Sequence, residues 1–395
     1  DIDEGKTVLF GDDFGVDDII WMGPQPRVEE FGEQTGADEV HSFAGLKNIL
    51  ANDQQQERNI LWLPQGRAEN KIMLSKLLDI SLEQVDAAVS EELIKAVVAQ
   101  RNVKSEEEVK EIEDALDISY DMNRLAMKLV RPGIIEQEVY GRVEGCVLSR
   151  SSRVSFPVIF SVHGETLHNH AHQNMMQKGD LLVMDSGAES KHCYASDITR
   201  TIPVSGSFTP EQKDIYNVVL RAQTDAIAMM KPGITNRSVH LEAARIIAEG
   251  MKDLGFMKSS TDDAVRAGAH ALFFPHGLGH MMGLDVHDME GLGEDYVGYG
   301  DEAERSTQFG LAYLRLAREL KPGYVVTVEP GIYFIPELID QWKEKGKHAA
   351  FINYDKVEKY RTFGGVRIED DVLITENGRT VLGKPIAKSL DEVEE

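Results

Sequence analysis

The chain has 395 residues, of which 42% are hydrophobic and 28% charged, and its net charge at pH 7 is −25. This length allows two domains, and no apolar run approaches the roughly 20 residues that a membrane span needs, so no membrane partner is expected. Nucleic acid is not an expected partner either, because phosphate binding depends on clustered Lys and Arg. The only cysteines, Cys146 and Cys193, indicate no disulfide framework and fit a reducing cytoplasm.

The first 103 residues predict a small α/β domain. Strand-like runs at residues 7–10 and 59–63 alternate with polar helical stretches. The chain opens at Asp1 with neither an initiator Met nor a signal-peptide pattern, and a strand follows almost at once. We therefore expect this N-terminal domain, residues 1–103, to be incomplete at its start.

A larger domain is expected over residues 104–395, beginning with a long helix. Ser105 followed by Glu108 is a capping box, in which each residue satisfies a backbone N–H of the other. Apolar residues recur behind it at helical spacing. Pro132 and Gly133 should end this helix at Arg131.

An internal repeat runs through this second domain. The segment 127–134 reappears at 228–234, with its Pro-Gly pair displaced by 100 residues (232 − 132). A glycine followed six residues later by a carboxylate, at the end of an apolar strand, also occurs twice. These pairs end at Asp185 (185 − 179) and Glu329 (329 − 323). Two halves that each deliver a carboxylate predict an α/β (α+β) domain of pseudo-twofold symmetry, with its site between the halves.

Four carboxylates stand where burial would be costly. Asp185, Glu329 and Glu369 each follow an apolar run, and a carboxylate that ends a buried strand has to be paired, protonated or bound to a cation. For any one of them, an ordinary ion pair or a turn is an equal alternative. Asp197 lies twelve residues after Asp185 (197 − 185), which suits a hairpin. If all four converge, they raise one another's pKa, and two divalent cations would resolve the repulsion.

Seven of the twelve histidines fall into two short windows, and the second holds His276, His280 and His287. Gly277 and Gly279 disfavour a helix there and let the backbone approach a ligand closely. A single histidine would more often be structural, but three in twelve residues favour a functional site. A set of ligands rich in carboxylates favours Mn²⁺, Co²⁺ or Zn²⁺ over a metal held by thiolates.

Other chemistries lack their motifs. No Gly-x-Ser-x-Gly turn for a nucleophilic serine and no phosphate-binding loop is present. The glycines of residues 141–145 lack the third glycine and the strand of a dinucleotide-binding fingerprint.

Together these motifs resemble the pita-bread metallopeptidases, which include methionine aminopeptidase, aminopeptidase P and prolidase. The resemblance covers the whole second domain, and the five metal-ligand positions of the family are intact and in order. They are Asp185 in Met-Asp-Ser-Gly-Ala-Glu, Asp197 in Ser-Asp-Ile-Thr-Arg, His280 in His-Gly-Leu-Gly-His, Glu329 in Val-Glu-Pro-Gly-Ile-Tyr and Glu369 in Gly-Gly-Val-Arg-Ile-Glu-Asp-Asp. The resemblance implies two divalent metal ions, with Mn²⁺ favoured and Co²⁺ or Zn²⁺ as alternatives.

The resemblance also implies a role for each ligand. Asp185 would chelate one metal, His280 and Glu329 would hold the other, and Asp197 and Glu369 would bridge them. A hydroxide shared by the metals would attack the scissile carbonyl. Glu329 would act as the catalytic proton acceptor.

Further residues match substrate contacts of the family. His276 and His287 would contact the substrate and stabilise the tetrahedral oxyanion. His168 matches a substrate-binding histidine, and Arg367 occupies another contact position. Arg315 aligns with a prolidase arginine that binds the C-terminal carboxylate of a dipeptide.

The Gly-Leu-Asp-Val-His-Asp run that ends at Asp288 resembles the proline-specific branch, and the C-terminal stretch looks most like prolidase. The implied function is an Xaa-Pro dipeptidase, working as a cytoplasmic homodimer on proline-containing di- or oligopeptides. The alternative is an Xaa-Pro aminopeptidase that takes longer peptides. A non-catalytic binding protein on the same fold is a more remote alternative, because such relatives lose metal ligands and this chain retains all five.

Overall fold

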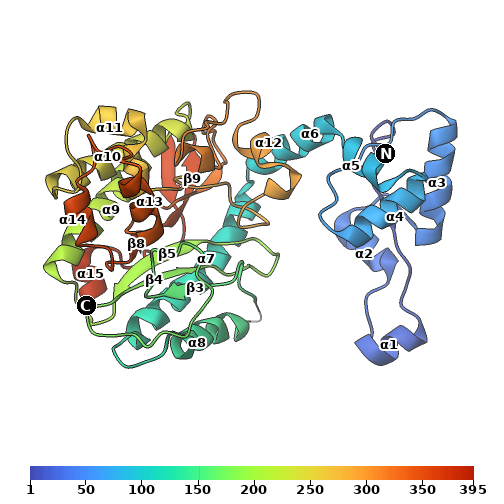
Figure 1. Cartoon of the computed structure of the whole chain (residues 1–395). Coiled ribbons are helices and arrows are strands. Elements are labelled where there is room, and N and C mark those ends of the chain that lie inside the picture. The colour runs from blue at the N-terminus through green and yellow to red at the C-terminus, as the bar shows by residue number, and fades with distance from the viewer. Residues whose placement is uncertain (151) are drawn as a thin grey trace. The chain divides into compact units, whose positions relative to one another are not determined.

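In the computed structural model, which describes residues 1–150 and 152–395, the chain divides into two compact units, Asp1–Ile94 and Lys95–Glu395 (Figure 1). Both units mix helices with short sheets. The mixed α/β class expected from the sequence is therefore confirmed. Within the described residues, no helix combines the length and the apolar character needed to cross a bilayer.

The first unit holds a two-stranded parallel sheet with helices around it. Strand β1 (Val8–Phe10) pairs with β2 (Glu39–His41) in the register Val8 opposite Glu39. The helices of this unit are α1 (Val16–Met22), α2 (Val28–Thr35), α3 (Phe43–Gln55), α4 (Ala68–Leu78) and α5 (Leu82–Ala87), and α6 (Glu91–Asn102) starts at its end.

The prediction of a strand over residues 59–63 is wrong. This segment forms no ladder with β1 or β2. Its polar groups bond instead to the helical region that follows: the backbone N–H of Ser90 donates to the carbonyl of Trp62 at 3.1 Å, and the Trp62 indole donates to the carbonyl of Val85 at 3.0 Å. Partners of this kind satisfy an extended backbone without a neighbouring strand.

The long helix expected at the start of the second domain is confirmed as α7 (Glu106–Leu129). The Ser105 hydroxyl accepts from the backbone N–H of Glu108 at 3.3 Å, and the Glu108 carboxylate accepts from the backbone N–H of Ser105 at 2.8 Å. The helix ends two residues before Arg131, because a residue that precedes a proline is forced out of the helical region. Helix α8 (Glu136–Leu148) follows the Pro-Gly turn.

The internal repeat is visible in the backbone. Gly133 and Gly233 both adopt left-handed φ values, 85° and 86°. The N–H of Gly133 donates to the carbonyl of Met176 at 2.8 Å, and the N–H of Gly233 donates to the carbonyl of Leu320 at 3.1 Å. Each acceptor lies three residues before the glycine of its own Gly-to-carboxylate segment (179 − 176 and 323 − 320). Each half therefore contains an equivalent turn, bonded to an equivalent segment before its strand.

Each half contributes an antiparallel sheet. In the first half, β3 (Ile159–Ser161), β4 (Leu181–Ser186) and β5 (Ile198–Pro203) lie in the order β3-β4-β5. In the second half, β6 (Val325–Val328), β9 (Asp370–Thr375) and β10 (Gly378–Val381) lie in the order β10-β9-β6. Strands β7 (Gly331–Tyr333) and β8 (Gly365–Arg367) form a separate antiparallel pair beside them.

Helices and short connections complete the second unit. Helices α9 (Pro210–Met229) and α10 (Asn236–Asp253) repeat the α7–α8 pair in the second half. The remaining elements are α11 (Thr261–Ala267), η1 (Ala269–Leu272), η2 (Glu290–Leu292), α12 (Glu294–Gly298), η3 (Leu311–Tyr313), α13 (Pro336–Glu344), α14 (Tyr354–Glu358) and α15 (Leu390–Glu394).

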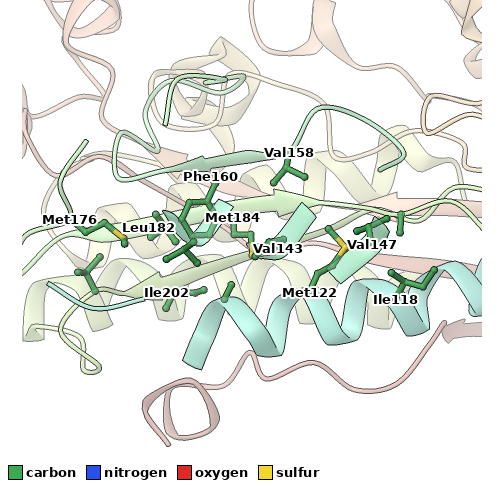
Figure 2. Packing of buried hydrophobic residues seen from close by; sticks show 14 residues of the cluster. Ile118, Met122, Val143, Val147, Val158, Phe160, Met176, Leu182, Met184 and Ile202 are labelled. Carbon is green, nitrogen blue, oxygen red and sulfur yellow. The ribbon is translucent and has the colours of Figure 1, made fainter. Parts of the chain in front are cut away.

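The core of the first half lies between its helices and its sheet, as Figure 2 shows. Met122 on α7, Val143 on α8 and Leu182 on β4 are all fully buried. Since this face of the sheet is filled by apolar side chains, the polar residues at the ends of β4 and β5 are left for the other side. Packing thereby fixes the strands that carry Asp185 and Asp197.

Candidate metal centre

Five predicted ligand side chains line one cavity of about 770 Å³ in the second unit. Asp185 lies near the end of β4, and Asp197 directly precedes β5. His280 lies on the glycine-rich loop after η1, Glu329 follows β6, and Glu369 lies between β8 and β9. The structure thus brings the five residues together from both halves.

The strand pairing explains why the two aspartates meet. Strands β4 and β5 are antiparallel, and Asp185 lies opposite Thr199, two residues after Asp197. The expected hairpin is therefore confirmed. On the other side of the cavity, β6 places Glu329 next to the loop that carries His280, since the N–H of Glu329 donates to the carbonyl of Leu278 at 2.8 Å.

Gly279 lets this loop lie directly against β6. A Cβ on Gly279 would lie 2.0 Å from the carbonyl oxygen of Thr327, so any larger residue would push the loop away. The N–H of Thr327 donates to the carbonyl of His280 at 3.0 Å, and the Thr327 hydroxyl accepts from the N–H of His280 at 3.1 Å. The loop is not helical, as the two glycines predicted.

Ligand atoms of Asp197, His280 and Glu369 all lie within 4.8 Å of one another. Nε2 of His280 is 3.5 Å from Asp197 Oδ2 and 3.7 Å from Glu329 Oε1. Its other nitrogen, Nδ1, is 3.2 Å from the carbonyl of Met281 and carries the proton that this acceptor requires. The lone pair of Nε2 therefore points at the carboxylates, as a metal-binding imidazole needs.

The carboxylates repel one another in this buried setting. Burial, followed by the charges of Glu369 and Asp185, raises the pKa of Asp197 well above its usual range. Burial, followed by the charges of Glu329 and Asp185, does the same to the pKa of Glu369. Burial raises the pKa of Glu329 to about 7, against the opposing charge of Arg367. Burial lowers the pKa of His280 to about 4, so its imidazole is neutral near pH 7.

A divalent cation fits this set of donors. Oδ1 of Asp185 and Oδ1 of Asp197 are buried and have no hydrogen-bond partner among the described residues. Unpaired buried oxygens are costly, and a cation would satisfy them and relieve the repulsion between the carboxylates. Oxygen donors together with one imidazole suit a hard or borderline divalent ion.

Neighbouring side chains fix the ligands in place. The Thr199 hydroxyl donates to Glu369 Oε2 at 2.5 Å, so β5 holds a ligand of the second half. Arg367 donates to Asp185 Oδ2 at 2.6 Å and to the hydroxyl of Tyr333 at 3.0 Å. The sequence did not indicate Thr199. Its place two residues after Asp197 on a predicted strand is the one signal, since residues two apart face the same side.

The residues expected to contact substrate also line the cavity: His168, His276, His287, Arg315 and Arg367. Both ring nitrogens of His276 have protein partners, the carbonyl of Gly277 at 2.7 Å and the hydroxyl of Tyr333 at 2.9 Å. Nδ1 of His287 lies 3.5 Å from Glu290, and Arg315 is paired with Glu290 and Glu294.

Asp288, which ends the motif typical of proline-specific enzymes, does not line the cavity. It is almost fully buried, and it pairs with Arg101 at 2.6 Å and with the buried Lys104 at 3.1 Å. These two cations lie at the α6–α7 junction. Asp288 therefore fixes the loop behind His287.

Comparison with known proteins identifies the family. The model of metallopeptidase family M24 matches residues 110–376, and that of the aminopeptidase P N-terminal domain matches residues 1–62. This chain belongs to metallopeptidase family M24.

Individual M24 relatives match over nearly the whole chain. The Xaa-Pro dipeptidase of Homo sapiens is 34% identical over 405 aligned residues, which cover 100% of this chain and 79% of the relative. A probable Xaa-Pro aminopeptidase of Fusarium vanettenii is 33% identical and covers 100% of this chain and 82% of its own.

Solved structures agree with the fold. Zinc-substituted Escherichia coli aminopeptidase P in complex with product superposes with a TM-score of 0.77 at 29% identity. The alignment covers 98% of this chain and 81% of the Escherichia coli chain. Aminopeptidase PepP of Pseudomonas aeruginosa gives the same TM-score and coverage at 27% identity. The chain therefore has the pita-bread fold of the M24 metallopeptidases.

Burial of the carboxyl groups makes the stability of the metal-free M24 chain depend on pH. A carboxyl group whose pKa is raised on folding binds its proton more tightly in the folded state, so stability is lost as pH rises from the unfolded pKa through the folded one. For Glu329 this window runs from 4.5 to about 7. Buried histidines contribute in the opposite direction, as His280 does, because burial lowers its pKa to about 4. We therefore predict that the free energy of unfolding of the chelated wild type, taken relative to that of Glu329→Gln, falls from pH 5 to pH 8, and that Mn²⁺ reverses the loss.

Urea denaturation of the chelated wild type and of chelated Glu329→Gln at each pH measures this difference. The matched control is Glu319→Gln, because Glu319 is exposed in the same unit. A difference between wild type and Glu329→Gln that stays constant or rises between pH 5 and pH 8 would contradict this account of Glu329.

Proposed function

We propose that this M24 metallopeptidase hydrolyses the bond between any residue and proline, as an Xaa-Pro dipeptidase. The observation that carries the proposal is the gathering of Asp185, Asp197, His280, Glu329 and Glu369 in one cavity, in a chain that matches Xaa-Pro dipeptidases over its full length. The Xaa-Pro aminopeptidases among its relatives support the alternative, an enzyme for longer peptides.

Proline specificity has a physical basis in the cavity. The nitrogen of an Xaa-Pro bond carries no hydrogen, so the site needs no acceptor for it. Apolar side chains form part of the cavity wall, which suits a pyrrolidine ring. They include Phe156, Leu167, Phe309, Ile335 and Leu338.

We propose two divalent metal ions, with Mn²⁺ favoured and Co²⁺ or Zn²⁺ as alternatives. Asp185 would hold one ion, His280 and Glu329 the other, and Asp197 and Glu369 both. Bound there, the ions would polarise the scissile carbonyl and lower the pKa of the attacking water.

The chain's own side chains would move protons and stabilise charge. Glu329 is the proposed proton acceptor, because as a ligand of one ion it would lie beside the attacking water. His276 and His287 would contact the substrate and the oxyanion, and His287 is the freer of the two, because both nitrogens of His276 are engaged. His168 would bind substrate from the β3–β4 loop. Arg367 would do so while orienting Asp185.

The substrate assay separates the two activities. With Mn²⁺ present, Gly-Pro should be cleaved faster than Gly-Pro-Pro-Ala, because Arg315 can bind the C-terminal carboxylate of a dipeptide. Chelation should abolish both reactions and Mn²⁺ should restore them. Faster cleavage of the tetrapeptide would favour an aminopeptidase. Activity that survives stringent chelation, with no metal found by elemental analysis, would refute the metal-dependent mechanism.

Removal of the His287 imidazole should slow the chemical step. His287→Ala is expected to lower kcat for Gly-Pro by about 10²-fold with a smaller change in KM, as for the loss of one oxyanion contact. His163→Ala is the control, because His163 is exposed, pairs with Glu165 and does not line the cavity. If kcat for His287→Ala stays within about threefold of the wild type, His287 has no role at the oxyanion.

We also propose a homodimer and a cytoplasmic location. Helix α1 supports a dimer, because none of its residues is buried and its apolar side chains are among the most exposed of the chain, with Trp21 85% exposed. An apolar helix left open to water favours a protein partner. Sedimentation equilibrium should give about twice the chain mass of 44.0 kDa, and Trp21→Ser should weaken the association. A monomer at micromolar concentration would contradict the dimer.

A further inference from the structure

Two carboxylates hold Arg315 at the wall of the cavity. Its Nη1 donates to Glu290 Oε2 at 2.5 Å and to Glu294 Oε2 at 3.1 Å. Glu294 is also paired with Arg305, which in turn pairs with Asp295 at 2.7 Å. Three carboxylates therefore face two guanidinium groups, and the positive charge of Arg315 is compensated before any substrate arrives.

Glu290 lies behind the cavity wall at the start of η2. Its side chain is only 16% exposed, and it is not one of the residues that line the cavity. The oxygen that accepts from Arg315 is also 3.5 Å from Nδ1 of His287. Glu290 thus contacts two residues that the proposed function places against the substrate.

The contacts leave one edge of Arg315 for a ligand. A guanidinium has five N–H donors, and the two on Nη1 face Glu290 and Glu294. In the described part of the chain, Nε and Nη2 of Arg315 donate no hydrogen bond to protein. A substrate carboxylate could bind side-on to this edge. The charge of Arg315 would already be compensated when this carboxylate binds, and the like charges of Glu290 and Glu294 would repel it.

We propose that Glu290 is a specificity-determining residue, which weakens the recognition of a free C-terminal carboxylate at Arg315 and so widens the accepted peptides beyond dipeptides. A longer peptide has no charge at this position and gains nothing from an unpaired Arg315. A dipeptide would gain from it. The proposal rests on the proposed Xaa-Pro specificity and deepens it, because it concerns the ratio between two peptides.

The kinetic test replaces the charge and keeps the shape. Glu290→Gln, assayed with Mn²⁺ at pH 8, should raise the ratio of kcat/KM for Gly-Pro to that for Gly-Pro-Pro-Ala about tenfold. Burial raises the pKa of Glu290 to about 7, against the charge of Arg315, so at pH 8 the wild-type carboxyl group is ionised. Any disturbance of His287 acts on both peptides and cancels in the ratio. Glu294→Gln should shift the ratio in the same direction.

Glu302→Gln is the matched control. Glu302 pairs with Arg318 and Lys321, and none of the three lines the cavity. This variant should leave the ratio unchanged. A ratio that Glu290→Gln does not change would overturn the proposal. A ratio that falls would also overturn it, because Glu290 would then be presenting Arg315 to the carboxylate.

A binding measurement makes the test independent of turnover. Proline and prolinamide differ only in the carboxylate, and neither is hydrolysed. Calorimetry on the Mn²⁺-loaded protein measures both dissociation constants. Glu290→Gln should lower the Kd of proline about tenfold, or about 1.4 kcal/mol, and change the Kd of prolinamide less than about twofold. Equal changes for both ligands, or weaker proline binding, would contradict the proposal. If the wild type cleaves neither peptide, the proposed function fails and this measurement still decides the role of Glu290.

Discussion

The repulsion among buried carboxylates is the constraint on which the second unit depends. Asp197 is 5% exposed and Glu369 is 2% exposed, and both lie within a few ångströms of His280. Without a cation, gathering these groups costs free energy, either as repulsion or as the uptake of protons, and packing has to offset that cost. The fully buried apolar layer beneath β4 supplies such packing, because moving one strand would expose it to water.

Hydrogen bonds that cross between the halves set the direction of two candidate ligands, Glu369 and Asp185. Thr199 of the first half holds Glu369 of the second, and Arg367 of the second half holds Asp185 of the first. Each carboxylate therefore has one oxygen turned away toward the protein, while Oδ1 of Asp185 has no such partner. This arrangement resembles that of other metal sites, where the neighbours of the ligands determine their orientation.

Local patterns predicted much of this structure, and their range explains what they missed. The capping box at Ser105 and the apolar run before Asp185 act over a few residues, and both elements formed where they were expected. The run at residues 59–63 has the same kind of pattern but no partner strand, and a strand cannot form alone.

The missed contacts join residues that lie far apart in the sequence. Arg367 and Asp185 are 182 residues apart, and Thr199 and Glu369 are 170 apart. No periodicity connects such positions. Glu290 is only 25 residues from Arg315, but they pair across the irregular stretch containing η2 and α12. The five candidate ligands were recognisable because the motif around each one is intact, whereas side chains that merely hold them carry no comparable signature.

The shared turns of the repeat give the metal centre a further significance. Asp185 and Asp197 come from the first half, whereas His280, Glu329 and Glu369 come from the second, so neither half carries a complete set of donors. Cations bound there would link the two similar halves. The free energy of metal binding would then add to the free energy that holds the two halves together, because a ligand that binds only the assembled form also stabilises it. A substitution that disrupts the packing of either half would therefore lower the affinity for metal, even when all five candidate ligands are unchanged.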